Sequence, residues 1–228
     1  MLSSPPFIIN KGWGGKDYNH IVKGDVYQIM KKIDKQKVLL YFTIVLFLMV
    51  TLTSLNLATE NPPLPKLEKP IFVTSCGQSP DFGTVDLLGR RAGVEMKVNH
   101  VALPEEIVGY KTLIIVIGGS GKGLGAAGID IPEEVKRVEE LIKKANEEEI
   151  FILGMHIGGV DRRGPVSADF VPFAAEADYL VVRTDGNEDG FFTNVAEENE
   201  IPLFLIEKTP ELVDIFKEMF AEENETTG

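Results

Sequence analysis

Short aliphatic runs that alternate with helical segments are the feature that most constrains the fold of this chain. LIIVI, IFILGM and YLVV are such runs, and they are typical of parallel strands buried on both faces of a sheet. Segments with apolar residues at helical spacing lie between them. Strands that alternate with helices build right-handed β–α–β units. The sequence therefore predicts an α/β domain over residues 70–224, with a three-layer, doubly wound (Rossmann- or flavodoxin-like) parallel sheet of about five or six strands.

The sequence also indicates where the expected strands and helices begin and end. The predicted strands are Ile71–Cys76, Glu95–Val101, Thr112–Ile117, Ile150–Met155, Tyr179–Arg183 and Leu203–Ile206. Helix starts are indicated where a capping residue is followed closely by a proline, as at Ser79-Pro80, Asp130-Ile131-Pro132 and Thr209-Pro210.

Charge and cysteine content exclude several classes of function. The chain has 23 basic and 35 acidic residues, and from Thr59 onward 16 basic residues stand against 32 acidic ones. A surface of this sign repels phosphate backbones, so nucleic acid is not expected as a partner. With one cysteine and three histidines, the chain cannot form an internal disulfide framework or a multi-cysteine metal centre. No metal is expected, and no cofactor is indicated.

An uncharged apolar segment runs from Val38 to Leu57, about the length that crosses a bilayer core. Four lysines at 31, 32, 35 and 37 precede it and Glu60 follows, which predicts a cytoplasmic N-terminus and an extracytoplasmic domain. An uncleaved membrane anchor and a signal peptide cleaved after Ala58 both fit this pattern. A buried core helix is the third alternative. The expected location is thus membrane-anchored, or secreted after signal cleavage.

The segments around the domain divide as follows. Residues 1–29 have no apolar period, and Met30 begins a typical export signal, so we expect 1–29 to be a mis-annotated extension. Residues 30–58 are the signal peptide or anchor, 59–69 a proline-containing linker, and 225–228 a tail.

Four loops of unusual composition follow predicted strands. They are Thr74–Asp81, Gly118–Gly128, Gly154–Gly164 and Asp185–Gly190. In an open α/β sheet the carboxyl ends of parallel strands share one edge, where ligands bind. The sequence therefore places its candidate site at this edge.

The loop 118–128 combines six glycines with Ser120 and Lys122. Backbone N–H groups and one ammonium could approach an anion closely there. The spacing matches neither a phosphate-binding loop nor a dinucleotide fingerprint. A flexible lid or linker is the alternative.

A second cationic group consists of His156, Arg162 and Arg163. Arginine binds carboxylate or phosphate in a bidentate manner. Alternatively, one arginine pairs with Asp161 or Asp169 to fix the loop. His156 follows directly from a strand and could be a structural donor or a catalytic base.

Residues 185–190, DGNEDG, match the first half of a calcium loop, but Ala196 stands where the bidentate acid should be. A polar turn that caps a helix carrying Phe191 and Phe192 is the alternative.

Cys76 precedes a helix N-terminus, a position that lowers a thiol pKa, and could form a nucleophile–base pair with His156. It could equally be a small apolar residue that ends a buried strand.

Together, TSCGQSPD, GGSGKGLGAAGID, GMHIGGVDRRG and DGNEDG resemble a bacterial family known as domain of unknown function 6305. The resemblance covers about residues 70–220. It implies a single α/β domain, sometimes exported, and no assigned activity. A weaker likeness to flavodoxins, carried by Thr74, Gly77 and Ser79 in the first loop, implies a flavin or nucleotide binder as an alternative.

We expect a binding module that holds a small anionic ligand of the carboxylate or phosphate type and serves a membrane partner. The residues expected to line one concavity are Ser79, Ser120, Lys122, His156, Arg162 and Arg163. A hydrolase or transferase that uses the same cleft is the alternative. The sequence has no H-E-x-x-H or G-x-S-x-G motif, which favours binding.

Overall fold

The computed structural model describes residues 37, 39–46 and 61–221. The chain divides into two compact units, Met1–Glu60 and Asn61–Gly228. In the first unit residues 39–46 are helical. No helix within the described ranges is long and apolar enough to span a membrane. Most of the apolar segment 38–57, residues 1–29 and the tail 225–228 lie outside the described residues.

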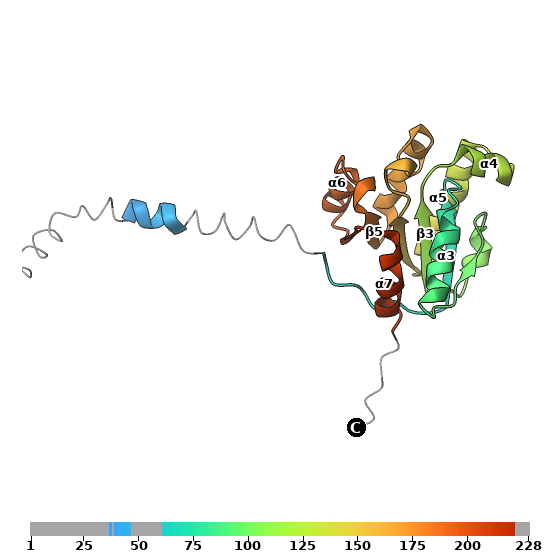
Figure 1. The fold of residues 1–228 in the computed structure, drawn as a ribbon, viewed down its shortest axis with the longest axis horizontal. Coiled ribbons are helices and arrows are strands. Elements are labelled where there is room, and N and C mark those ends of the chain that lie inside the picture. Colours follow the sequence, from blue (N-terminus) through green and yellow to red (C-terminus); the bar gives the residue numbers. More distant parts are fainter. Residues whose placement is uncertain (1–36, 38, 47–60, 222–228) are drawn as a thin grey trace, which may run out of the picture. The chain divides into compact units, whose positions relative to one another are not determined.

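The second unit contains one parallel sheet of six strands, which confirms the predicted fold (Figure 1). The strands are β1 (Ile71–Cys76), β2 (Lys97–Val98), β3 (Thr112–Ile117), β4 (Phe151–His156), β5 (Tyr179–Arg183) and β6 (Leu203–Ile206). Their order is β2-β1-β3-β4-β5-β6, with every neighbouring pair parallel. This is the flavodoxin order with one further strand, not the Rossmann order.

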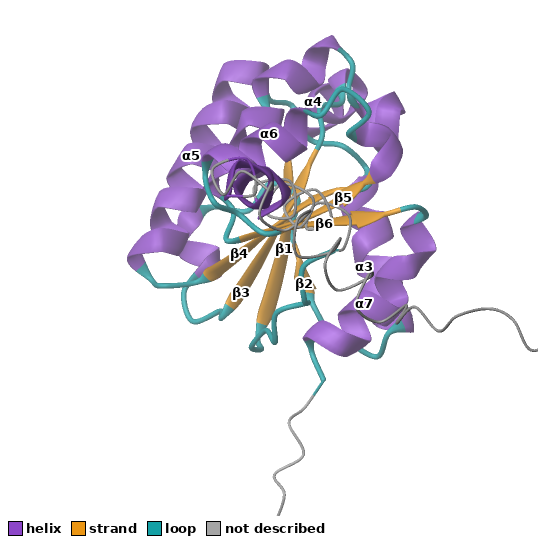
Figure 2. Cartoon of the chain, turned by 90° about the vertical axis from the view of Figure 1, so that its left-hand side faces the viewer, coloured by secondary structure: helices purple, strands orange, loops and turns teal. Residues whose placement is uncertain are grey.

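Helices cover both faces of the sheet, as Figure 2 shows. Helices α3 (Asp81–Arg91) and α7 (Leu212–Met219) pack on one face of the sheet. Their apolar side chains form a core there with the side chains of β1 and β3 that point to the same face. Helices α4 (Gly121–Ala127), α5 (Ile131–Glu147) and α6 (Phe191–Glu198) pack on the other face. The near-continuous aliphatic runs are explained by this double coverage, because all six residues of β1 and of β3 are buried.

The chain changes direction between β1 and β3. From β1 it passes to α3 on one face, and from the neighbouring β3 it passes to α4 and α5 on the other. The helices that follow these two neighbouring strands therefore lie on opposite faces of the sheet, and the carboxyl edge between them is the usual ligand position in such a fold.

Three segments differ from the prediction. The strand expected over Glu95–Val101 is only Lys97–Val98, because Asn99 turns the chain by accepting the N–H of Val101 on its side-chain oxygen. The glycine-rich loop contains a helix, α4, which is capped by Ser120 and ended by Gly128 at φ 71°. Three short 3-10 helices, Gly159–Arg162, Pro165–Asp169 and Val171–Glu176, fill the connection from β4 to β5.

The described part of the expected linker, residues 61–69, lies on the domain. Asn61 donates to and accepts from the backbone of Leu205, and the N–H of Leu67 donates to the carbonyl of Met219. Leu64 and Leu67 pack against the core beneath α7. This stretch is therefore extended, as its prolines predict, and is attached to the domain by hydrogen bonds and apolar contacts.

Candidate functional site

A cavity of about 540 Å³ opens at the switch point between β1 and β3, and we call it the switch-point cavity. It is lined by Gln78, Pro80, Phe82, His100, Ser120, Lys122, Gly123, Ala126 and Arg162. None of these described lining residues is acidic, although acidic residues outnumber basic ones in this part of the chain. The cavity therefore has a local charge opposite to that of the domain that contains it.

The two cations that line this cavity, Lys122 and Arg162, still have N–H groups with which to bind an anion. Lys122 is exposed and forms no hydrogen bond or ion pair with any described residue. Nε of Arg162 lies 3.3 Å from Oδ2 of Asp81, and its guanidinium donates no hydrogen bond to any residue within 61–221. An ammonium and a guanidinium edge are thus available to one anion.

The serines predicted for the site have different roles. Ser120 lines the cavity, and its Oγ accepts the N–H of Gly123 as the cap of α4, which leaves its hydroxyl hydrogen free to donate. Ser79 is fully buried, and its Oγ donates to Oδ2 of Asp81 at 2.5 Å. Ser79 therefore contributes by holding the carboxylate that positions Arg162.

The other two predicted residues do not line this cavity. His156 is fully buried, with Nδ1 3.0 Å from the carbonyl oxygen of Ile117 and Nε2 3.3 Å from that of Gly159. Burial lowers the pKa of its imidazole and outweighs the two carbonyls, which act in the opposite direction. His156 is thus a neutral structural residue that joins the ends of β3 and β4.

Arg163, like His156, has a structural role, because it holds two loops together. It donates to the carbonyl of Gly186 at 2.8 Å and to Oδ2 of Asp189 at 2.6 Å, and its guanidinium lies against the rings of Phe191 and Phe192. The single concavity expected for all six residues therefore forms from Ser120, Lys122 and Arg162, with Ser79 behind it. The aspartates that pair with the two arginines are Asp81 and Asp189, not Asp161 or Asp169.

A second cavity of about 410 Å³ shares Arg162 with the first. It is lined by Asp81, Thr84, Ile157, Gly158, Asp161, Arg162, Arg183 and Thr209. Its other cation, Arg183, is engaged by both oxygens of Asp185, which raises the pKa of the guanidinium and lowers that of the carboxyl group. The charges of this cavity are largely neutralised, so it is a weaker anion site.

Glycines in the 118–128 loop serve close backbone packing. A Cβ on Gly123 would lie 1.9 Å from the carbonyl oxygen of Gln78, and one on Gly119 would lie 2.5 Å from the backbone of Val166. Gly119 also forms a β-bridge with Gln78. The loops after β1 and β3 can form one cavity wall because these positions carry no side chain.

A buried polar network that no sequence pattern predicts lies behind that wall. Glu134 is fully buried, and its Oε1 accepts the N–H of Gly77 at 2.9 Å and Nε2 of Gln78 at 3.0 Å. Arg137 donates to both Glu134 oxygens and to the carbonyls of Ser75 and Ala102. In sequence the pair looks like any i, i+3 ion pair on a helix surface, so no signal distinguishes it.

Cys76, the candidate nucleophile, lies in an environment that does not activate a thiol. Cys76 is fully buried, and its Sγ donates to the carbonyl of Phe170 at 3.7 Å. Burial raises the pKa of this thiol far above its usual range, and nearby Glu134 raises it further. No hydrogen bond among the described residues joins it to His156, so its role is that of an apolar residue at a strand end.

The DGNEDG turn is a helix cap. Oδ1 of Asn187 accepts the N–H groups of Phe192 and Thr193, and Asp189 accepts that of Phe191. Across the described part of the chain, no group of three or more His, Cys, Asp or Glu side chains is arranged to hold a metal ion.

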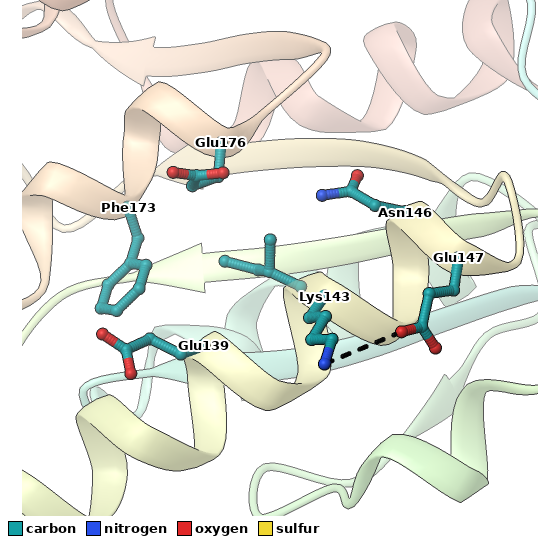
Figure 3. Close-up of a pocket in the computed structure, with 7 residues that line it drawn as sticks. Glu139, Lys143, Asn146, Glu147, Phe173 and Glu176 are labelled. Carbon is teal, nitrogen blue, oxygen red and sulfur yellow. Dashed lines mark ion pairs between the residues drawn. The ribbon is translucent and has the colours of Figure 1, made fainter.

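A third cavity, of about 580 Å³, lies along the second half of α5 (Figure 3). Glu139, Lys143, Asn146 and Glu147 of α5 line it together with Phe173 and Glu176, and Lys143 lies 4.0 Å from Glu147. None of the predicted site residues lines it.

The fold and the switch-point cavity define an α/β protein of flavodoxin strand order with a cation-lined cleft at its carboxyl edge. The chain belongs to the DUF6305 family, described as a domain of unknown function, whose sequence profile matches residues 68–220. No curated protein matches the chain.

Among solved structures the chain is similar to several proteins at low identity. The psychrotrophic esterase EstA from Pseudoalteromonas sp. is 13% identical, with 59% of this chain and 76% of that chain covered and a TM-score of 0.26. TesA is 15% identical, with 59% and 77% covered and a TM-score of 0.29. AlinE4, an SGNH-hydrolase family esterase, is 12% identical, with 68% and 85% covered and a TM-score of 0.29. Similarity at this level carries no argument about function.

Proposed function

We propose that the domain binds a small anion of the carboxylate or phosphate type in the switch-point cavity. The observation that carries the proposal is the pairing pattern of its cations: Lys122 has no partner among the described residues, and Arg162 has one ion pair, with Asp81, and donates no hydrogen bond from its guanidinium to any of them. In a domain with about twice as many acidic as basic residues, cations with this remaining capacity beside a cavity whose lining has no carboxylate favour an anionic occupant.

The geometry supports a binding role better than catalysis. A hydrolase that used this cleft would need a nucleophile within reach of a base. The Cys76 thiol is buried, and the Ser79 hydroxyl is held by Asp81 without a histidine beside it in the described contacts. Ser120 lines the cavity, but its oxygen accepts the N–H of Gly123 as a helix cap, and no described hydrogen bond joins its hydroxyl to a base.

A thermal-shift titration of the full chain with inorganic phosphate and with small carboxylates tests the proposal. At least one anion should raise the melting temperature, and Lys122→Glu should abolish this rise while leaving the melting temperature without ligand unchanged. Lys136→Glu is the matched control, because it makes the same charge change on an exposed lysine outside the cavity. An equal loss in both variants, or no stabilisation by any anion, would contradict the proposal.

We further propose that the domain works outside the cytoplasm, held by residues 38–57 or released by cleavage. The charge asymmetry around that segment supports this location. Thr59→Cys supplies a labelling site, and the native Cys76 is buried and should not compete. An impermeant thiol reagent should label the variant on intact cells, and labelling only after lysis would contradict this location.

A further inference from the structure

The second histidine of the domain, His100, is placed differently from His156. His100 is half-buried, lines the switch-point cavity and stacks on Phe82 with ring centroids 5.0 Å apart. Its Nδ1 lies 2.7 Å from Oε1 of Gln78. Its Nε2 forms no hydrogen bond with any residue that the structure describes.

The orientation of the Gln78 amide is fixed from its other side. Nε2 of Gln78 lies 2.8 Å from the carbonyl oxygen of His100 and 3.0 Å from Oε1 of Glu134. Both of these atoms are acceptors, and Glu134 is ion-paired with Arg137. A flipped amide would place an oxygen against two acceptors, so the nitrogen must occupy this position. Oε1 of Gln78 therefore faces His100 as an acceptor.

The state of the imidazole follows from that orientation. An acceptor at 2.7 Å requires a hydrogen on Nδ1 of His100. In a neutral ring the other nitrogen, Nε2, then carries a lone pair and no hydrogen. The buried series of hydrogen bonds from Arg137 through Glu134 to Gln78 thus determines that His100 carries its hydrogen on Nδ1 and its lone pair on Nε2.

We propose that His100 is the hydrogen-bond acceptor of the switch-point cavity, so that the cavity selects anions that carry a hydroxyl donor over anions that carry none. The inference rests on the proposed function and adds a selectivity to it. Lys122, Arg162 and the Ser120 hydroxyl supply donors to the oxygens of the anion, and Nε2 of His100 supplies an acceptor that no described residue uses. Phosphate fits this set because its P–OH donates, whereas sulfate of the same shape and charge has no hydrogen to donate.

The tautomer can be measured without any ligand. The full chain contains three histidines, so selective ¹⁵N-histidine labelling gives a simple spectrum, and His100→Asn identifies the His100 signals. At pH 8 we expect a protonated Nδ1 and an unprotonated Nε2, the opposite of the tautomer that histidine favours in water. A protonated Nε2 would overturn the inference and would leave the proposed anion site intact.

The selectivity is tested by calorimetric titration with phosphate and sulfate at pH 8 and constant ionic strength. Phosphate should bind about tenfold more tightly than sulfate, the size expected of one hydrogen bond between a neutral and a charged partner. His100→Asn keeps a donor near Gln78 and lacks Nε2, so it should bind both anions with the affinity of sulfate in the wild type. His100→Gln, which can place an amide oxygen near the position of Nε2, should restore part of the preference.

The outcomes separate the two proposals. Equal affinities for phosphate and sulfate in the wild-type protein would overturn the selectivity and would support the anion site. Binding of neither anion would overturn both the anion site and its selectivity. The tautomer measurement would then show whether Gln78 nevertheless places the hydrogen of His100 on Nδ1. A phosphate preference that survives in His100→Asn would show that another residue provides it and would also overturn the inference.

Discussion

Glu134 and Arg137 show how burial changes the contribution of an ordinary helical ion pair to stability. Both lie behind the cavity wall, with exposed fractions of 0% and 9%. Removing one member leaves the other charged, buried and without its partner, which destabilises a protein by about 3–5 kcal/mol. Glu134→Gln or Arg137→Met should therefore lower the free energy of unfolding in urea by this amount.

The double variant Glu134→Leu/Arg137→Met sharpens this prediction. Because it removes both charges together, it should be more stable than either single variant. Lys136→Met, on the exposed side of the same helix, is the control and should change stability by less than about 0.5 kcal/mol. A double variant as unstable as the sum of the singles would show that the two residues act independently.

Cys76 leads to a second prediction at the residue scale. Its thiol is fully buried, and its raised pKa keeps it protonated well above neutral pH. Since the thiolate is the reactive form, iodoacetamide should modify the native protein at pH 8 far more slowly than the urea-unfolded protein. As the only cysteine of the chain, it can be followed by mass alone. Comparable rates in the two states would restore Cys76 as a candidate nucleophile.

At the scale of elements, the short helix α4 depends on glycines of two kinds. Gly123 faces the carbonyl of Gln78, where a Cβ would lie 1.9 Å from the oxygen, whereas a Cβ on Gly125 would meet nothing within 4 Å. Both lie inside the helix. Gly125→Ala should therefore stabilise the protein by up to about 1 kcal/mol through helix propensity.

Gly123→Ala gains the same propensity but must push the two loops apart. We expect it to lower the melting temperature and to weaken anion binding in the switch-point cavity, because Gln78 and Ser120 would separate. Thermal unfolding of the two variants with and without phosphate measures both effects. Equal behaviour of the two alanines would mean that the glycine-rich composition serves flexibility and not close packing.

The connection between β4 and β5 was beyond the reach of sequence periodicity. Its three 3-10 helices are too short to produce a helical pattern, and they are stabilised by distant groups. Oγ of Ser167, for example, accepts the N–H of Gly119 and donates to the carbonyl of Arg162. Arg162 reaches the cavity through this packing, which depends on residues from both sides of the sheet.

At the scale of the whole molecule, the sequence predicts the layers and the edge but not the direction of individual side chains. The aliphatic runs identify β1, β3, β4, β5 and β6 because burial on both faces leaves a continuous apolar signal. The same reasoning places Lys122, Arg162 and Arg163 at one edge. It cannot separate Arg162 from its neighbour Arg163, because pairing with Asp81 or with Asp189 is decided by contacts between distant loops.

The global stability of the protein should depend on pH through His156. Burial lowers the pKa of its imidazole in the folded state, while the unfolded chain has the ordinary value of about 6.5. Below about pH 6.5 the unfolded state therefore binds a proton that the folded state does not, and the free energy of unfolding falls as the pH falls. The contribution of His156 is fully present above pH 6.5 and is lost as the pH drops toward the folded pKa.

Urea unfolding at pH 7, 6 and 5 measures this dependence. One such proton changes the free energy of unfolding by at most about 1.4 kcal/mol per pH unit. His156→Gln is less stable at pH 7, because it loses the packing of the ring against Phe192, but its stability should fall less steeply between pH 7 and 5. The difference in slope, not the difference in stability, is the signature of the buried imidazole. Parallel curves for the two proteins would mean that His156 takes up its proton while folded, with the carbonyls of Ile117 and Gly159 accepting from both ring nitrogens.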